Sequence, residues 1–353
     1  MSVARYAYVY ARIRARLGDM LTDRDLRALV DARKEDFIAT LMDTPYKVSL
    51  AKENLTEIDA HMIEKAMKQE LIHQYLIVIR STEASLRDFM IELFRRFEVM
   101  NMKAIIRAKA GAAGTTTTES VLLFPVEPLF KDYRSVLATD SVEEAIKHFE
   151  EPYRAALEAS IPEYKRSNRI LDLENALDRV LFSAIYSSKE HLRRADREIV
   201  EKLIGTELDI ANILTLLRCK EEGIAVADME RYFMPYSYAF DPDVDAVRDA
   251  ISADSISSAI QLLPDCPYKS VLSDAIPHYE EQKSLLPFEL ALRRYSFVWI
   301  RKAMFGYPID IGTVLGYLYL KELEIRNICT IAVCKENELP AEETLKLMIS
   351  DKM

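Results

Sequence analysis

The chain has 353 residues, 47 of them cationic and 57 anionic, so its formal net charge is 47 − 57 = −10. This acidic balance argues against a general nucleic-acid-binding protein, because affinity for phosphates requires a basic surface. Half of the residues are apolar, which allows a substantial core in one large domain or two. No stretch approaches about 18 consecutive apolar residues and no secretion signal is recognisable, so we expect neither a membrane span nor export by that route.

The composition predicts an all-α fold. The chain contains only eight glycines, too few for strands joined by tight hairpin turns. Apolar residues return every three or four positions through long segments at 53–80, 173–204 and 311–336, which are rich in good helix formers. We therefore expect about 70% helix or more, against about a third in an average protein.

The first segment is basic, unlike the rest of the chain. Residues 1–34 carry eight cations against four anions. In "YVYARIRARL", Arg12 and Arg16 are four residues apart and share one helix face, with Arg14 between them. These three arginines are the candidate partner-binding residues, as a docking surface for an acidic partner. The alternative is an ordinary solvated helix face.

Three sequence elements then recur in the same order, three times. The first is a Pro-Tyr-cation triplet that begins at Pro45, Pro152 and Pro267. The second is a short apolar stretch that carries Glu64, Glu174 and Glu289. The third is a helical pattern that carries Asn101, Asn212 and Asn327. The proline-to-asparagine spacings are 56, 60 and 60 residues, and the glutamate-to-asparagine spacings are 37, 38 and 38.

Each copy is a set of helices that exposes an apolar face until it packs on a neighbour. A short amphipathic helix should end before each Pro-Tyr, because proline disfavours helix at the preceding residue. We predict three repeated lobes, at residues 1–112, 113–224 and 225–353, related by a pseudo-threefold axis or stacked as a short solenoid.

The asparagine helices share further charged positions. An acid precedes each asparagine by three residues (Glu98, Asp209, Glu324), and a lysine follows it by eight (Lys109, Lys220, Lys335). Each asparagine lies in an apolar heptad seam, so we expect a buried, hydrogen-bonded amide that fixes the register between helices. A direct role in ligand binding is the alternative. The helices should end at residues that tolerate a left-handed cap, namely Gly111, Gly223 and Asn337.

An arginine follows the asparagine by six residues in two copies only. Arg107 and Arg218 match, but the third copy has Val333, so this arginine is not essential to a symmetric site. Cations also follow the repeated glutamates by four or five residues, at Lys68, Arg179 and Arg293. This spacing is typical of helix-surface ion pairs, and pairs between helices are the alternative.

Two segments between the copies read as loops: "GAAGTTTTES" from Gly111 and "YSYAFDPDVDAVRD" from Tyr236. The second contains Asp241, Asp243 and Asp245 at the spacing of calcium-loop ligands. It lacks the glycine at position six, where Ala246 stands, and the glutamate at position twelve, where Ser252 stands. We therefore predict an acidic linker and no metal site.

Catalytic signatures are absent from the sequence. There is no phosphate loop, GxGxxG, GxSxG, HExxH or DDxxD motif. The four cysteines have unrelated spacings and no histidine at ligand spacing, so we expect reduced thiols and neither zinc nor disulfides. They are Cys219, Cys266, Cys329 and Cys334. We predict no catalytic residue, cofactor or small-molecule substrate. An enzyme would instead show a deep pocket with convergent, perturbed carboxylates.

The opening "YAYVYARIRARL" and the stretch "NMKAIIRAKAG", with the threefold repeat, resemble the C subunit of the archaeal and bacterial A/V-type rotary ATPases, a relative of the d subunit of the vacuolar ATPase. The resemblance covers essentially the whole chain. It carries the family pattern at Tyr8, Ala11, Arg12 and Arg14, and in the pairs Asn101 with Arg107 and Asn212 with Arg218. Asn327 lacks its arginine, so that lobe departs from the pattern.

The resemblance implies a non-catalytic, three-lobed helical funnel peripheral to the membrane, on the cytoplasmic end of the proteolipid rotor ring. It implies a socket for the D and F subunits of the central stalk, which would transmit torque between ATP chemistry and proton or sodium transport. The competing hypothesis is a soluble helical-repeat adaptor without a rotor role.

Overall fold

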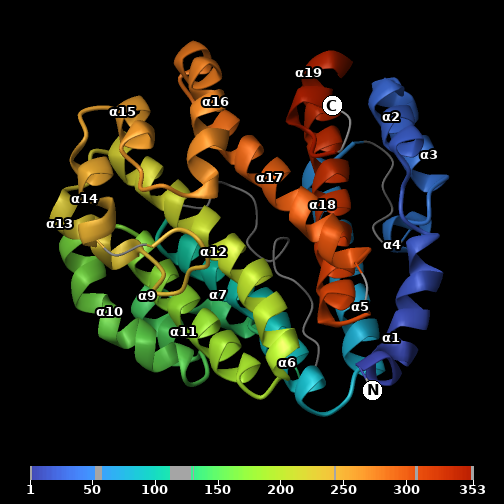
Figure 1. The fold of residues 1–353 in the computed structure, drawn as a ribbon, viewed down its shortest axis with the longest axis horizontal. Helices are drawn as coiled ribbons and strands as arrows, with labels where there is room; N and C mark the ends of the chain where they lie inside the picture. Colours follow the sequence, from blue (N-terminus) through green and yellow to red (C-terminus); the bar gives the residue numbers. More distant parts are fainter. Residues whose placement is uncertain are drawn as a thin grey trace. The chain divides into compact units, whose positions relative to one another are not determined.

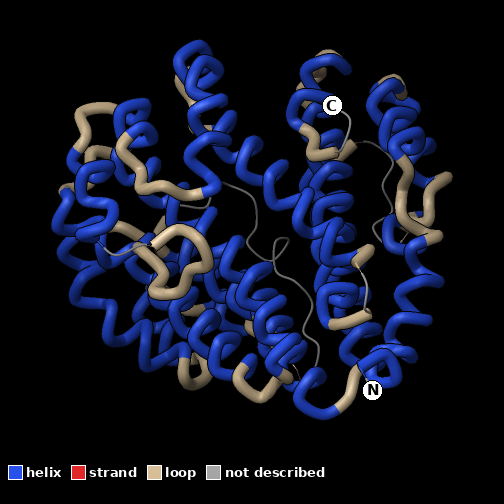
Figure 2. The backbone as a smooth tube through the Cα atoms, in the orientation of Figure 1, coloured by secondary structure: helices blue, strands red, loops and turns tan. Residues whose placement is uncertain are grey.

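The computed structural model describes residues 2–51, 58–111, 129, 131–241, 244–306 and 309–350. Helices make up 77% of the structure, and no strand occurs in these ranges (Figure 2). The all-α prediction is therefore confirmed. Of the expected loop "GAAGTTTTES", all but Gly111 lies outside the described residues, as do the side chains of Asp243, Asp245 and Ala246.

The chain divides into two compact units, whose helices are labelled in Figure 1. Unit 1 comprises Met1–Leu192 and Tyr307–Met348, and unit 2 is essentially Arg193–Gly306. The main α-helices of unit 1 are α1 (Ser2–Leu17), α2 (Asp23–Asp31), α3 (Phe37–Met42), α4 (Lys47–Leu50), α5 (Ala60–Ser81), α6 (Ala84–Phe94), α7 (Arg96–Lys109), α9 (Val142–Lys147), α10 (Tyr153–Ser167), α11 (Leu171–Lys189), α18 (Ile311–Glu336) and α19 (Ala341–Leu347). Those of unit 2 are α12 (Arg194–Glu221), α13 (Val226–Met229), α14 (Val244–Ser252), α15 (Ile256–Gln261), α16 (Pro267–Gln282) and α17 (Leu286–Met304).

Each unit buries its own apolar core between long helices. In unit 1, α18 packs along α5 and α1, and α10 packs along α11. In unit 2, α17 packs between α16 and α12. The expected helix at 311–336 is confirmed as α18, and α5 accounts for the described part of the helix expected at 53–80.

The helical segment expected at 173–204 consists of two helices. Helix α11 ends at Lys189, a turn follows, and α12 begins at Arg194. Residues 190–193 contain neither glycine nor proline, so local propensity does not mark the break. It coincides with the division between the units, where Leu192 is buried in the turn. Tertiary packing therefore overrides helix propensity here.

The predicted punctuation around Pro-Tyr is confirmed. Helices α3, α9 and α15 all end a few residues before the proline of their copy. Ser141 and Ser255 begin α9 and α15 by accepting a hydrogen bond from the backbone N–H three residues later.

The ends of the asparagine helices are confirmed in two copies of three. Gly111 and Gly223 adopt φ of 73° and 64°. In the third copy Asn337 keeps a negative φ, and the next residue, Glu338, takes the left-handed conformation with φ of 58°. Glu338 occupies the same position as Gly111 and Gly223, immediately after the helix cap. The position at the helix end therefore determines which residue is left-handed, although glutamate does not favour that conformation.

Candidate functional site

The repeated lysines make the same contact in all three copies. The Nζ atom of each lysine donates to two backbone carbonyls, two residues apart, at the end of a short helical segment in the following copy: residues 134–138, α14 or α2. Lys109 donates to Leu137 and Thr139 at 2.5 and 2.6 Å, Lys220 to Ile251 and Ala253 at 2.8 and 2.5 Å, and Lys335 to Val30 at 2.6 Å and Ala32. A cation at a helix C-terminus satisfies carbonyls that have no partner within the helix.

The acid three residues before each asparagine is also bound by the following copy. A tyrosine hydroxyl donates to each carboxylate: Tyr133 to Glu98 at 2.9 Å, Tyr268 to Asp209 at 2.7 Å, and Tyr46 to Glu324. Backbone N–H groups add to each of these sites: those of Tyr238, Ala239 and Phe240 to Asp209, that of Leu21 to Glu324, and that of Lys131 to Glu98. Tyr46 and Tyr268 belong to the Pro-Tyr triplets, whereas in the second copy the donor is Tyr133 and not the triplet's Tyr153. We call these three buried clusters the acid locks.

Burial sets the pKa of the acids in two locks. Asp209 is fully buried, and this raises its pKa above the ordinary 3.8, although the backbone N–H bonds and Tyr268 act in the opposite direction. Burial likewise raises the pKa of Glu98, against the effects of Tyr133 and Arg95. The pKa values of Tyr133 and Tyr268 are raised as well, mainly by burial and then by the charge of the acid that each one binds.

The pH dependence of stability should reveal this shift at Asp209. A carboxylate whose pKa is raised on folding contributes stability below its unfolded pKa and loses that contribution as pH rises through the folded pKa. The advantage of the wild-type protein over Asp209→Asn should therefore shrink as pH rises above about 3.8. Urea unfolding of both proteins at a series of pH values measures it. An advantage that grows with pH would contradict the shift.

Asn212 is buried and hydrogen-bonded, as predicted, but its amide binds a loop. Its Nδ2 donates to the Met234 carbonyl at 3.1 Å, and its Oδ1 accepts from the Met234 N–H at 2.7 Å. The amide therefore clamps an extended backbone segment and does not set register between two helices at this point. Asn101 and Asn327 are buried as well.

Asn212→Ala should destabilise the protein by about 1 to 3 kcal/mol, because it leaves two buried backbone groups of Met234 without partners. Chemical denaturation measures the loss. Asn337→Ala is the matched control, since that amide is exposed and bonds only to Val333 within its own helix turn. Equal stability of the Asn212→Ala and wild-type proteins would contradict this assignment.

The repeated glutamates and arginines form ion pairs between successive copies. Arg107 binds both carboxylate oxygens of Glu174, at 2.6 and 3.0 Å. Arg218 lies 3.6 Å from Glu289. Pairs within one helix, as predicted, join Lys68 to Glu64 at 2.6 Å and Arg293 to Glu289 at 2.9 Å. Arg179 is the exception, since its Nε donates to Asn175.

Val333 occupies the place of the arginine where the third copy meets the first. By the repeat, its partner would be Glu64. Helices α5 and α18 pack along one another. Burial, and then the charge of Glu64, raises the pKa of Cys329, one turn before Val333, to about 12. Val333 is 49% exposed, so this interface lacks an ion pair that the other two have.

Restoring the arginine should stabilise the protein slightly. We expect Val333→Arg to add about 0.2 to 1 kcal/mol, the usual contribution of a partly exposed pair. Thermal unfolding at low and high salt measures the gain, which salt should reduce. The gain should vanish when Glu64→Gln is added. A gain that persists without Glu64 would refute the pairing.

The contacts of the three copies form a closed series. Copy one bonds to copy two, copy two to copy three, and α18 of copy three returns to α2, α4 and α5 of copy one. The bonds of Lys109 and Arg107 cross the expected lobe division at 112/113, and those of Lys220 and Arg218 cross the division at 224/225. The lobe boundaries themselves stay a prediction.

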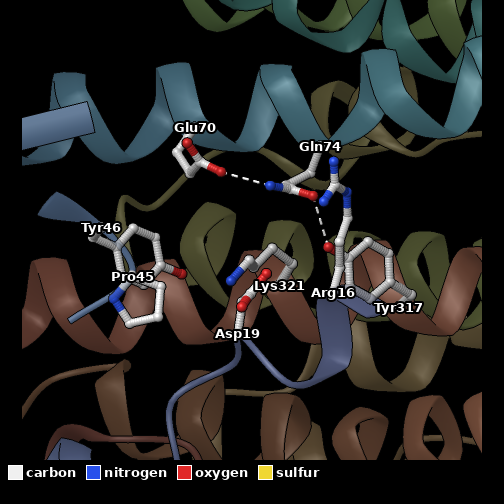
Figure 3. A pocket seen from close by; sticks show the side chains of 8 residues that line it. All are labelled: Arg16, Asp19, Pro45, Tyr46, Glu70, Gln74, Tyr317 and Lys321. Carbon is white, nitrogen blue, oxygen red and sulfur yellow. Dashed lines mark hydrogen bonds between the residues drawn. The ribbon is translucent and has the colours of Figure 1, made fainter. Parts of the chain in front are cut away.

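The three candidate arginines of α1 lie in two environments. Arg12 and Arg14 are exposed, while Tyr6, Val9 and Ile13 bury the opposite face of the helix. Arg16 is half-buried and lines a cavity of about 70 Å³ in unit 1 (Figure 3). Arg12 and Arg16 share one helix face, as predicted, but Arg12 faces solvent and Arg16 faces the cavity.

The cavity is polar on all sides and adjoins the third acid lock (Figure 3). Arg16 and Asp19 lie at and just after the end of α1, Pro45 and Tyr46 precede α4, Glu70 and Gln74 come from α5, and Tyr317 and Lys321 come from α18. Tyr317 donates to Gln74 at 2.7 Å, and Gln74 donates to Glu70 at 2.5 Å. Burial raises the pKa of Tyr317.

Opposite charges in and beside this cavity are largely paired. Lys321 is buried, lies 2.8 Å from Glu324 and stacks over the Tyr46 ring at 4.7 Å from its centroid. Glu70 accepts from Ser49 and Gln74. The buried Nε of Arg16 has no hydrogen-bond partner within the described ranges. The cavity thus offers one donor to water or a small polar group.

Neither a metal site nor a membrane span is found among the residues that the structure describes. Within these ranges, no three His, Cys, Asp or Glu side chains gather in a way that could hold a metal ion. In the same part of the chain, no helix is long and apolar enough to cross a membrane. Sequence reasoning missed Glu70, Gln74, Tyr317 and Lys321. The recurring order of Tyr46 and Glu324 within the repeat was the one signal that could have led to this cavity.

Comparisons with known proteins agree along nearly the whole chain. The family model described as ATP synthase (C/AC39) subunit matches residues 9–347. The C subunit of the A-type ATP synthase of Methanothermobacter thermautotrophicus is 28% identical over 348 residues, which cover 98% of this chain and 88% of that protein. The corresponding protein of Methanobrevibacter smithii is 26% identical over 352 residues, covering 99% and 89%. That of Halobacterium salinarum is 25% identical over 343 residues, covering 96% of each chain. The chain therefore belongs to the ATP synthase (C/AC39) subunit family, whose members are structural and not catalytic subunits.

Proposed function

We propose that this chain is the C subunit of an A/V-type rotary ATP synthase or ATPase and joins the central stalk to the membrane rotor. In this role it sits peripherally on the cytoplasmic end of the proteolipid ring. It receives the foot of the stalk, formed by the D and F subunits, and transmits torque between ATP chemistry and proton or sodium transport. It needs no cofactor of its own.

The observation that carries the proposal is the closed series of contacts between the three copies. A solenoid leaves its first and last repeats unpaired with each other, whereas here α18 bonds to the first copy through Lys335 and Glu324. We infer the three-lobed funnel, with a concave socket for a helical plug, from the resemblance to the C subunits, and this order of contacts between the copies supports three related lobes. The full-length match to the C subunits of archaeal ATP synthases supports the same role.

The exposed arginines of α1 are the proposed contacts with an acidic partner in the complex. Arg12 and Arg14 project from a helix whose opposite face is anchored in unit 1, so the helix presents them on a rigid element. Charge complementarity at such a surface mainly sets specificity and the rate of association. Arg16, held at the cavity, would orient the end of the helix.

Affinity purification from gently solubilised membranes of the host tests the assignment. We expect the tagged protein to bring stalk and proteolipid subunits with it in fixed stoichiometry. Recovery of the protein alone, from the soluble fraction only, would overturn the proposal in favour of the helical-repeat adaptor.

A charge-reversal pair tests the role of α1. Arg12→Glu/Arg14→Glu should reduce recovery of the partner subunits at least tenfold, because it places like charges against an acidic surface. Arg24→Glu/Arg27→Glu is the matched control: both residues are exposed on the neighbouring α2, and the net charge changes by the same amount. Equal recovery with the two double variants would refute the α1 surface while leaving the subunit assignment intact.

A further inference from the structure

The end of α17, in unit 2, is basic and aromatic in an acidic chain. Residues 290–306 contain four cations and no anion, in a protein whose net charge is −10. The same stretch contains four aromatic residues, among them Trp299, the single tryptophan of the sequence. Neither the repeats nor the acid locks require this composition.

Helical geometry gathers these residues on one face. Arg294, Val298, Arg301 and Phe305 follow one another at spacings of four, three and four, with Lys302 beside them. Val298 is 61% exposed and Phe305 is 58% exposed, so two large apolar side chains face solvent on the same helix face as the cations. The face therefore alternates cations with exposed apolar groups. We call it the α17 face.

Two lysines flank the tryptophan at the edge of this face. The Nζ of Lys202, from α12, lies 3.4 Å from the Trp299 ring centroid, and that of Lys302 lies 5.3 Å from it. Neither lysine has a carboxylate partner in the part of the chain that the structure describes. The exposed ring of Tyr238 lies 6.0 Å from Lys202 on its other side. Burial, and then the charge of Lys302, lowers the pKa of Lys202.

Two neighbouring cations without anions form a site that an anion would complete. Their mutual repulsion and the partial desolvation of Lys202 are costs that a phosphate group between them would relieve. The exposed side chains of Val298 and Phe305, beside these cations, would be stabilised by contact with an apolar phase. A surface that offers phosphates and hydrocarbon together is the headgroup layer of a phospholipid membrane.

We propose that the α17 face, with Lys202 and Trp299, binds the headgroup layer of an anionic phospholipid membrane. Lysine and arginine stems cross apolar surface while their charges stay in water, and tryptophan favours the boundary between headgroups and hydrocarbon. Basic residues beside exposed apolar side chains are the usual composition of such interfacial contacts. This contact is made by the chain alone and requires neither the stalk nor the ring. It can therefore be tested independently of the proposed function.

The single tryptophan makes the test direct. The purified full chain is mixed with vesicles of phosphatidylcholine containing phosphatidylglycerol, and separately with vesicles of phosphatidylcholine alone. We expect Trp299 emission to shift to shorter wavelength, and the protein to sediment with vesicles, only when phosphatidylglycerol is present. Binding should weaken as salt rises. An unchanged emission spectrum, or equal binding to neutral vesicles, would overturn the proposal.

Charge variants separate the α17 face from general attraction. Lys202→Gln/Lys302→Gln should weaken vesicle binding by about fivefold for each charge removed. Lys47→Gln/Lys147→Gln removes the same charge from two exposed positions of unit 1 and should change binding less than twofold. Phe305→Ser should weaken binding about tenfold, whereas Leu262→Ser, at a 50% exposed position elsewhere, should not. Circular dichroism confirms that each variant is folded.

The variants also distinguish other occupants. Equal loss in the two lysine pairs would show attraction by net charge alone and overturn the assignment. Full displacement of vesicles by millimolar inorganic phosphate would point to a free phosphate site and overturn it too. Purified complex that retains an acidic subunit only when Lys202 and Lys302 are present, with no vesicle binding by the chain, would assign the face to a protein partner.

Discussion

Asp209→Leu is expected to destabilise unit 2 by about 3 to 5 kcal/mol, the usual cost of breaking a buried polar network by removing one member. The carboxylate is fully buried and accepts from backbone N–H groups and the Tyr268 hydroxyl. Leucine is larger than aspartate, so no cavity contributes, and overpacking adds to the loss. The rest of the loss is the desolvation of donors that keep no partner. Equilibrium unfolding in urea measures it.

Tyr268→Phe provides the graded comparison for this lock. It removes the hydroxyl donor and leaves the carboxylate its backbone bonds, so a loss of about 1 kcal/mol is expected. If Asp209→Leu costs no more than Tyr268→Phe, the backbone bonds to the acid contribute little. The acid lock would then be a tyrosine contact only.

Gly205→Ala is expected to cost about 1 to 3 kcal/mol through overpacking, and more if the adjoining lock opens. A Cβ atom at Gly205 would lie 2.6 Å from the Tyr238 Cβ and 3.2 Å from the Tyr238 backbone nitrogen. Rotation of a side chain cannot relieve these contacts, so the loop must move. The same loop donates the Tyr238 N–H to Asp209, one turn further along α12.

Gly18→Ala is the control for this substitution. Its nearest neighbour to an added Cβ is the Ala15 carbonyl at 3.6 Å, an ordinary contact. Thermal unfolding should separate the two variants by several degrees. Addition of Asp209→Leu to Gly205→Ala should cost less than the sum of the single losses, because both release the same loop. Additive losses would show that the loop tolerates the added methyl group without leaving the acid.

The repeat made much of this structure predictable. Asn212 and Asp209 were identified as buried or repeated polar positions because they recur at fixed spacing in apolar seams. Their partners were not identified: the sequence contains no sign that Asn212 binds Met234 or that Asp209 binds Tyr268. Such contacts depend on which copy packs on which, and the periodicity within a helix is the same for either arrangement.

Departures from the repeat were visible in the sequence but could not be interpreted there. Val333 was recognised as a missing arginine, yet its consequence at Glu64 follows only from the contact of α18 with α5. No residue in the turn between α11 and α12 indicates that a helix ends there. Glu338, and not Asn337 as expected, adopts the left-handed conformation. Helix propensity is a weak preference of a few tenths of a kcal/mol per residue, which tertiary packing exceeds.

The sequence by itself determined the helical class, the three copies, the order of their elements and the family, because these depend on composition, on period and on residues in fixed local register. Only the tertiary structure decided that the third copy bonds back to the first, that Arg16 lines a cavity while Arg12 and Arg14 stay exposed, and that Lys202 meets Trp299. These are contacts between residues far apart in the chain, and their selection depends on the free energy of burying whole helix faces together, which no local pattern records.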